Sequence, residues 1–270
     1  MTSLRTPIKA VRTSLCLGLL ACATLLASTA QAQTALDDIL KAKEIQIGIP
    51  TDFPPYGSMG TDMTPHGLDV DMAGYIASKL GVKIDLVPVS SNNRVAYLQT
   101  KKVSLVISTL GKSPDREKVI DFTAAYSPFF IGVFGPKSIA VKTPADLAGK
   151  TIAVTTGAVD DDELTKVAPS GANIRRFSEN AGTVAAYSTG QTQLIAANIA
   201  TASAIMSQNP QLNTEYKFGL KDSPNFIGVA KGEDTLRMKV NEIIAQARQN
   251  GDLDKLSLKW LGKPAGDLPQ

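Results

Sequence analysis

A segment near the middle of the chain places one arginine just beyond a short apolar stretch. Residues 105–107 are apolar and predict a buried strand. Ser108, Thr109 and Gly111 follow, and side chains this small let a ligand reach hydroxyls and backbone amides. Arg116 comes next, and its planar guanidinium can hold a carboxylate through two parallel hydrogen bonds. The segment therefore predicts a site for a small carboxylate-bearing molecule.

Arg116 also has a second interpretation, because Asp115 and Glu117 flank it. A surface arginine paired with a neighbouring carboxylate is common and contributes little to stability. The small residues that precede Arg116 favour the binding role, because they leave room for a ligand beside the backbone.

A second segment, residues 155–160, combines a strand end with a helix start around Gly157, and we expect the helix to begin near Asp160. The unpaired amides and positive dipole of a helix N-terminus can bind a carboxylate. The acidic run at 160–163 offers a metal site as the alternative. Acidic residues in a first helical turn explain the run without a metal, and His66 is the only histidine. We expect no metal and no other cofactor.

Apolar spacing along the chain predicts alternating strands and helices. The expected order is strand 44–49, helix 67–80, strand 83–89, helix 92–101 and strand 103–108, and then strand 151–154, a helix from near 160, strand 173–176, helix 183–189 and strand 194–197. A long amphipathic segment, 235–261, closes the chain. Such alternation with short connections predicts an α/β fold with mostly parallel sheets flanked by helices.

Two apolar extended runs, 128–134 and 226–230, bracket the second series of elements. They predict that the chain leaves a first lobe and later returns to it. We expect a discontinuous first lobe of residues 33–134 and 226–270 and a second lobe of residues 135–225. A ligand would then bind in the cleft between the lobes, at the carboxyl ends of strands.

The N-terminus has the order of a secretory signal peptide. Three basic residues precede an apolar run at 15–27 and an Ala-Gln-Ala sequence that ends at Ala32. We expect residues 1–32 to be cleaved and the protein to be periplasmic; Cys22, which ends a Leu-Leu-Ala-Cys sequence, offers lipoprotein anchoring as the alternative. Cleavage leaves 25 basic and 25 acidic residues and neither cysteine. The exported chain therefore has no disulfide and no electrostatic reason to bind nucleic acid.

Short motifs recur in a set order along the chain: Thr51-Asp-Phe-Pro-Pro-Tyr56, His66-Gly-Leu-Asp-Val-Asp-Met-Ala73, Ser91-Asn-Asn-Arg94, the Arg116 segment, Asp146-Leu-Ala-Gly-Lys150, Gly251-Asp-Leu-Asp-Lys255 and Lys259-Trp-Leu-Gly262. In this order and spacing the chain resembles the periplasmic amino-acid-binding proteins of ABC importers, solute-binding protein family 3 of the polar amino acid type. The resemblance covers essentially the whole chain after residue 32. It implies the two-lobed type II periplasmic binding protein fold, with two hinge strands between the lobes.

The resemblance implies contacts for the first lobe. Arg116 would bind the α-carboxylate of the ligand, with Thr109 and the backbone near Gly111 completing the contact; the family often has serine or threonine at position 111. Ser91 and Arg94 match an element that contacts the side-chain carboxylate in relatives that bind acidic amino acids. The alternative is that Arg94 begins an exposed helix.

The second lobe departs from the family pattern. Ala158 and Val159 stand where threonine or serine is usual, so only backbone contacts survive there. A second-lobe aspartate usually neutralises the ammonium group of the ligand, and Asn198 stands at the matching place. An amide cannot cancel a buried positive charge. Either Asp52 or Asp160 takes that role, or the ligand is not an ordinary α-amino acid.

The turn after the first strand holds further candidates. Phe53 and Tyr56 can stack on a ligand, and Asp52 can reach a cationic group. The alternative is a turn shaped by Pro54 and Pro55, with aromatic rings that cap the core.

These features predict a non-enzymatic, monomeric binding protein. It would close on a small carboxylate ligand, such as an amino acid, and present the closed form to an ABC permease in the inner membrane. No catalytic residue is expected. The alternative is an enzyme on the same fold, of the cyclohexadienyl dehydratase type, which would need a carboxylic acid placed for proton transfer. A role in signalling would require docking to a separate receptor.

Overall fold

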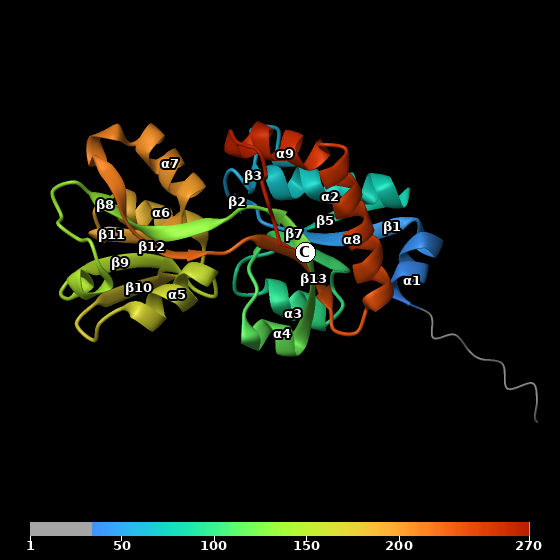
Figure 1. Ribbon diagram of the computed structural model, residues 1–270, viewed down its shortest axis with the longest axis horizontal. Helices are drawn as coiled ribbons and strands as arrows, with labels where there is room; N and C mark the ends of the chain where they lie inside the picture. Colours follow the sequence, from blue (N-terminus) through green and yellow to red (C-terminus); the bar gives the residue numbers. More distant parts are fainter. Residues whose placement is uncertain (1–33, 270) are drawn as a thin grey trace, which may run out of the picture. The chain divides into compact units, whose positions relative to one another are not determined.

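The structure is a computed structural model that describes residues 34–269 (Figure 1). These residues belong to one compact unit that contains two five-stranded sheets and one three-stranded sheet. The predicted signal peptide, residues 1–32, lies outside the described residues. From residue 34 to residue 269, no helix is long and apolar enough to cross a membrane.

The first five-stranded sheet has the strand order β5 (Lys83–Pro88), β1 (Glu44–Ile49), β6 (Leu105–Leu110), β13 (Asn225–Ala230) and β7 (Ile120–Ser127). β1 pairs in parallel with β5 and β6, whereas β13 runs antiparallel to β6 and β7. Every residue of the central strand β6 is buried. A continuous apolar strand of this kind is typical of a sheet that is covered on both faces.

Helices cover this sheet. α2 (Leu68–Leu80), α8 (Asp234–Gln249) and α9 (Asp252–Leu261) contact one another, and α3 (Arg94–Gln99) and α4 (Pro114–Val119) lie below the sheet in Figure 1. α1 (Ala35–Ala42) contacts α8 and β1. The predicted segment 235–261 is two helices rather than one run, because Gly251 adopts φ 76°, a left-handed conformation that favours glycine.

The second five-stranded sheet has the strand order β10 (Asn173–Phe177), β9 (Thr151–Thr155), β11 (Leu194–Asn198), β8 (Phe130–Pro136) and β12 (Thr214–Asp222). β9 runs parallel to β10 and β11, and β8 runs antiparallel to β11 and β12. The helices α5 (Val159–Val167), α6 (Asn180–Ser188) and α7 (Ile199–Gln208) pack against it, and short 3₁₀ turns η1 (Pro144–Leu147) and η2 (Pro210–Leu212) complete the connections. The α/β class with helix-flanked sheets is thus as predicted.

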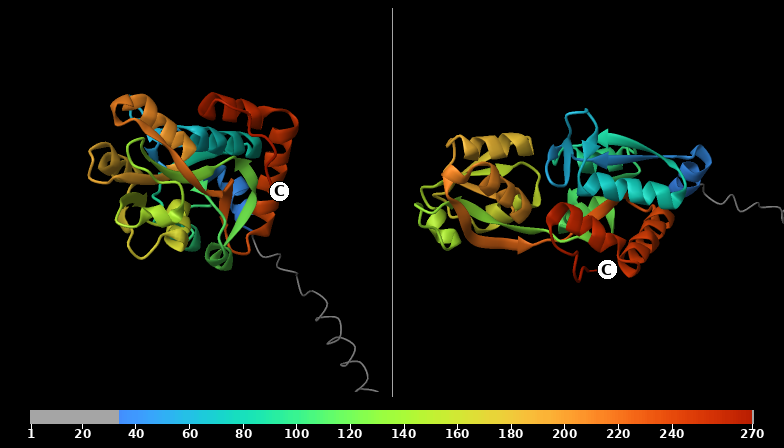
Figure 2. Two further views of the ribbon diagram at one scale, coloured as in Figure 1. Left: turned by 60° about the vertical axis from the view of Figure 1, so that its left-hand side comes forward. Right: turned by 90° about the horizontal axis from the view of Figure 1, so that it is seen from above.

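The chain passes between the two sheets twice, from β7 to β8 and from β12 to β13 (Figures 1 and 2). We call the parts around the first and second sheets the first lobe (34–127 and 225–269) and the second lobe (130–222). β8 pairs only with strands of the second sheet, which moves the first crossing from the predicted residue 134 to residues 128–129. An apolar run indicates a strand but not the sheet that it joins, and the lobe boundaries themselves stay a prediction.

A small antiparallel sheet follows β1 on the first lobe. It consists of β2 (Asp52–Phe53), β3 (Gly57–Met59) and β4 (Pro65–His66). β2 contacts α6, so this small sheet brings residues of the first lobe against a helix of the second.

Candidate functional site

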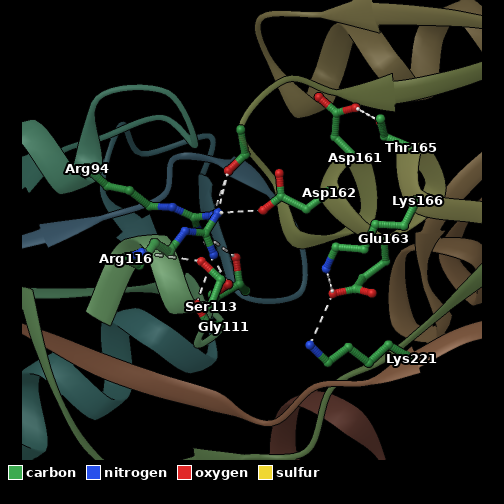
Figure 3. A network of polar contacts seen from close by, with 12 residues as sticks. Arg94, Gly111, Ser113, Arg116, Asp161, Asp162, Glu163, Thr165, Lys166 and Lys221 are labelled. Carbon is green, nitrogen blue, oxygen red and sulfur yellow. Dashed lines mark hydrogen bonds and ion pairs between the residues drawn. The ribbon is translucent and has the colours of Figure 1, made fainter. Parts of the chain in front are cut away.

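Arg116 lies on the short helix α4, which the sequence pattern did not predict. Ser113 caps this helix: its hydroxyl accepts a hydrogen bond from the Arg116 amide at 3.3 Å, and Pro114 takes the first helical position. The Arg116 guanidinium donates to the carbonyl oxygens of Gly111 and Gly157, each at 2.8 Å (Figure 3). Gly157 belongs to the second lobe, so Arg116 joins the two lobes at the predicted site.

Arg94 is the first residue of α3, and it is only 2% exposed. One terminal nitrogen donates to the carbonyl oxygen of Ser108 and lies 3.4 Å from that of Thr109; the other lies 3.5 Å from the carbonyl oxygen of Gly157. Its Nε atom has no hydrogen-bond partner. Burial, together with the nearby charge of Arg116, lowers the pKa of Arg94 to about 9. Arg94 therefore does not begin an exposed helix; it is a buried cation beside Arg116.

Asp69 stabilises the segment that accepts hydrogen bonds from Arg94, although sequence reasoning did not select it. It is fully buried, and its carboxylate accepts a hydrogen bond from the Tyr126 hydroxyl at 2.6 Å and one from the Thr109 amide at 2.9 Å. Thr109 has φ 45°, a left-handed conformation that is uncommon for a residue with a side chain. The bond from Asp69 fixes Thr109 in this conformation. Burial raises the pKa of Asp69 to about 7.

Gly111 and Val159 face each other across the lobes. A Cβ atom at position 111 would lie 2.6 Å from Cγ2 of Val159 and 2.8 Å from Oγ of Ser223, which is too close for either atom. The two residues both depart from the family pattern described above, and they fit each other. Val159 fills the space that a larger residue at position 111 would need.

Gly157 also permits a close approach between the lobes. It has φ 73°, and a Cβ atom there would lie 2.9 Å from Oδ1 of Asn92 and 3.2 Å from the carbonyl oxygen of Ser91. Ala158 follows as the first flanking residue of α5 and provides no side-chain cap. The second lobe therefore presents backbone rather than hydroxyl groups at this point.

Asp160 lies in the first turn of α5 and is 6% exposed. Burial raises its pKa to about 6, while the charges of Arg94 and Arg116 act in the opposite direction. Asp160 also contributes to the raised pKa of Tyr56. Because Tyr56, Arg94 and Arg116 all belong to the first lobe, the Asp160 carboxyl faces the first lobe across the cleft.

The next two acidic residues have other partners. Asp161 accepts hydrogen bonds from Nε of Arg176 at 2.9 and 3.1 Å, and the Asp162 carboxylate lies 3.7 Å from the Arg116 guanidinium (Figure 3). Within residues 34–269, no group of three or more His, Cys, Asp or Glu side chains is placed to hold a metal ion.

Two cavities open along the contact between the lobes. One has a volume of about 630 Å³ and is lined mostly by polar and charged residues, including Ser91, Asn92, Arg116 and Arg176. The other has a volume of about 440 Å³ and is lined mainly by apolar groups, among them Tyr56, Pro128, Ile199 and Trp260. Ser91 and Arg116 thus line the same cavity.

The Asp52 carboxylate contacts the start of helix α6. It accepts hydrogen bonds from the backbone amides of Asn180 and Ala181, at 2.8 and 3.3 Å, and from the Asn180 side chain at 3.3 Å. These are the first residues of α6, so a first-lobe carboxylate caps a second-lobe helix. The sequence contains no local signal for this contact, because the partners are far apart along the chain.

Phe53 and Tyr56 are both buried in the apolar core of the first lobe. Their ring centroids are 5.6 Å apart, and the Tyr56 ring lies the same distance from that of Phe129. This packing matches the alternative in which the aromatic residues cap the core, and Tyr56 also lines the apolar cavity.

Asn198 is fully buried at the start of α7. Its side-chain oxygen accepts a hydrogen bond from the Thr201 amide at 3.0 Å, and its side-chain nitrogen donates to the Thr201 hydroxyl at 2.8 Å. Both ends of the amide are therefore used to cap the helix.

The converging arginines define what the site can bind. Arg94 and Arg116 both point a terminal nitrogen at the carbonyl oxygen of Gly157, and like charges so close repel each other unless an anion lies between them. A carboxylate can accept the same hydrogen bonds and also neutralise charge. This arrangement can bind an anionic group.

Two α/β lobes that meet at a cation-lined cleft define the class of solute-binding proteins. Residues 45–263 match the model of the bacterial extracellular solute-binding proteins, family 3, and the chain belongs to this family.

Known relatives agree with this placement. The chain is 28% identical to the L-cystine-binding protein TcyJ of Escherichia coli over 231 residues, which cover 84% of this chain and 86% of that protein. Among solved structures, a mutant of the arginine-binding protein ArgBP of T. maritima matches with a TM-score of 0.78, 28% identity and coverage of 84% and 99% of the two chains. The L-cysteine solute receptor of Neisseria gonorrhoeae matches with a TM-score of 0.78, 29% identity and coverage of 84% and 93%.

Proposed function

We propose that this protein is the extracytoplasmic binding subunit of an ABC importer and that it binds an amino acid or a related small carboxylate between its lobes. The observation that carries the proposal is the convergence of Arg94 and Arg116 on one carbonyl oxygen of the opposite lobe. A ligand carboxylate that takes the place of this oxygen would gain both guanidinium groups as partners. The names of the relatives, which bind cystine, arginine and cysteine, support an amino acid.

In this proposal the protein binds its ligand and catalyses no reaction. The signal peptide directs export and is removed by cleavage after Ala32, and the periplasmic monomer then closes on its ligand and delivers it to a permease. Closure buries the ligand between two surfaces, which supplies affinity and distinguishes loaded from empty protein. No nucleic acid takes part.

A thermal-shift screen tests the proposal. The protein processed after Ala32 is freed of carried-over ligand and heated with the amino acids and with matching keto acids, dicarboxylates and amines. A ligand that binds only the folded state raises the melting temperature according to how far its concentration exceeds its dissociation constant. We expect at least one carboxylate to stabilise the protein and simple amines to have no effect. Stabilisation by amines alone would overturn the proposal.

One observation keeps an enzymatic alternative in view. Asp160 is a buried carboxylic acid whose pKa lies near 6, a value suited to proton transfer. An ancestral amino-acid-binding protein described as a precursor of cyclohexadienyl dehydratase matches this chain with a TM-score of 0.76 and 27% identity. We expect no turnover of prephenate or arogenate by the purified protein, and measurable turnover would favour the enzyme.

A further inference from the structure

Of the acidic side chains that the structure describes around the cleft, Asp160 has no side-chain hydrogen-bond donor and no ion-pair partner, whereas others have partners of their own; Asp115, for example, is paired with Lys118. Asp52 caps α6, Asp69 bonds to Tyr126 and Thr109, and Asp161 is paired with Arg176. Asp162 lies 3.7 Å from Arg116 and is about half exposed, so water screens it. Among residues 34–269, no side chain donates a hydrogen bond to Asp160, and no cation lies within 4 Å of its carboxylate. Its contacts therefore leave Asp160 available to a ligand.

Charge balance gives this carboxylate a role. Two buried arginines can accommodate an anion, but a ligand that also carries an ammonium group must bury a positive charge beside them. A buried ammonium without a carboxylate partner is costly. We propose that Asp160 binds the ammonium group of the ligand and thereby makes the site selective for α-amino acids over acids that lack the amine. This inference rests on the proposed function and names the ligand class of the same site.

The position of Asp160 suits this role. It follows Gly157 by three residues, at the start of α5. The Gly157 carbonyl oxygen accepts from both guanidinium groups, and the Asp160 carboxyl interacts electrostatically with both arginines. The carboxylate and ammonium of an α-amino acid are attached to one carbon, so a ligand held by Arg116 would place its ammonium group in the region where Asp160 and Arg116 interact electrostatically. Asp52, the other carboxylate that the sequence offers for this role, caps α6, and Asn198, at the position of the family aspartate, caps α7.

Burial makes the neutral form of Asp160 more stable, and an ammonium partner reverses this preference. Tyr56, Arg94 and Arg116 face Asp160 from the first lobe, and Asp161 adjoins it on its own helix. The tyrosine stays neutral and both arginines stay charged between pH 5 and 7, while Asp161 is held by Arg176. An amino acid that binds near pH 6 should therefore release a proton, and an acid without the amine should not.

The test compares amino acids with analogues that lack only the α-amine. The pairs are L-cystine with 3,3′-dithiodipropionate, L-arginine with 5-guanidinopentanoate and L-glutamate with glutarate. Calorimetry of the wild type, Asp160→Asn and Asp161→Asn gives the dissociation constants. Asp161→Asn is the matched control, since it removes the same charge from the same helical turn. Melting temperatures establish that each variant is folded, and Asp160→Ser serves as a second substitution.

For the wild type we expect at least one amino acid to bind at least about thirtyfold more tightly than its analogue, as for a desolvated charge pair. Asp160→Asn should remove most of this difference and the proton release at pH 6, and Asp161→Asn should keep both. A wild type that binds both members of a pair equally, or an Asp160→Asn variant that keeps the difference, would overturn the inference while leaving the proposed function intact. A wild type that binds none of the six compounds and no other carboxylate in the screen would overturn both.

Discussion

The two sides of the cleft differ in what they offer a ligand. The first lobe presents charged side chains, Arg94 and Arg116. Arg94 bonds to backbone carbonyl groups beside the buried Asp69 network, and Arg116 bonds to the carbonyl oxygen of Gly111. The second lobe presents the backbone turn around Gly157 and the buried carboxyl group of Asp160. Recognition by side chains needs rigid support, whereas recognition by backbone needs small residues that allow close approach. Gly111 and Val159, two of the sequence departures of this chain, lie where the second lobe meets the first.

The comparison implies that charge on the first lobe dominates affinity, and Arg116→Ala tests this most directly. We expect binding of the most stabilising amino acid to weaken by roughly 2–5 kcal/mol, because the ligand carboxylate would lose a desolvated partner. Arg237→Ala, which removes an arginine paired with Asp234 on α8, is the control and should leave affinity unchanged. Unchanged affinity of Arg116→Ala in calorimetry would exclude Arg116 from the site.

The second test concerns the support of the first lobe. Asp69→Ala leaves the Tyr126 hydroxyl and the Thr109 amide without their buried acceptor, so we expect unfolding in urea to require roughly 2–4 kcal/mol less free energy. Asp71→Ala on the same helix removes more exposed bonds to Lys259 and Trp260 and should cost less. Equal losses for the two variants would show that the Asp69 network gives no special support.

Each lobe contributes one buried carboxyl with a raised pKa, Asp69 at about 7 and Asp160 at about 6. Between the ordinary pKa of an aspartate and these values, the native protein binds more protons than the unfolded chain. Stability therefore falls as pH rises through this window. We expect the ligand-free protein to gain roughly 1–3 kcal/mol of unfolding free energy between pH 8 and pH 5.

Urea unfolding at pH 5, 6, 7 and 8 measures this effect. Asp69→Asn should reduce the change of unfolding free energy near pH 7, and Asp160→Asn should reduce it near pH 6. The two variants therefore distinguish the contributions of the two lobes. Below about pH 4 the trend should reverse, because carboxylates with lowered pKa, such as Asp121 and Glu163, lose their ion pairs. A stability that rises from pH 5 to pH 8 would contradict both assignments.

The smallest effect concerns the fit between the lobes. Gly111→Ala should cost roughly 1 kcal/mol of unfolding free energy, because the new methyl group meets Val159 and Ser223. Adding Val159→Ala should recover part of this cost, a coupling that a double-mutant cycle measures. Gly74→Ala, a helical position with open space around it, should be neutral or stabilising. Additive effects of Gly111→Ala and Val159→Ala on the unfolding free energy would mean that the two positions are not sterically coupled.

Local patterns were sufficient to predict the alternating elements, the buried strand before Thr109 and the position of Arg116 beside a cleft. They could not predict contacts between distant segments. The burial of Arg94 depends on carbonyl groups of β6, and the sheet that β8 joins depends on β11 and β12. Asp69 stands in a motif that the sequence made visible, yet its partners Tyr126 and Thr109 are 57 and 40 residues away. Periodicity carries no information at such separations.

The cap that Asp52 provides for α6 makes the end of that helix depend on the position of the other lobe. When the lobes separate, the amides of Asn180 and Ala181 lose their acceptor and become free to exchange with solvent. Deuterium uptake at these two amides should therefore follow the open population of the protein directly. Exchange at these amides therefore reports the separation of the lobes without an attached dye and without knowledge of the ligand.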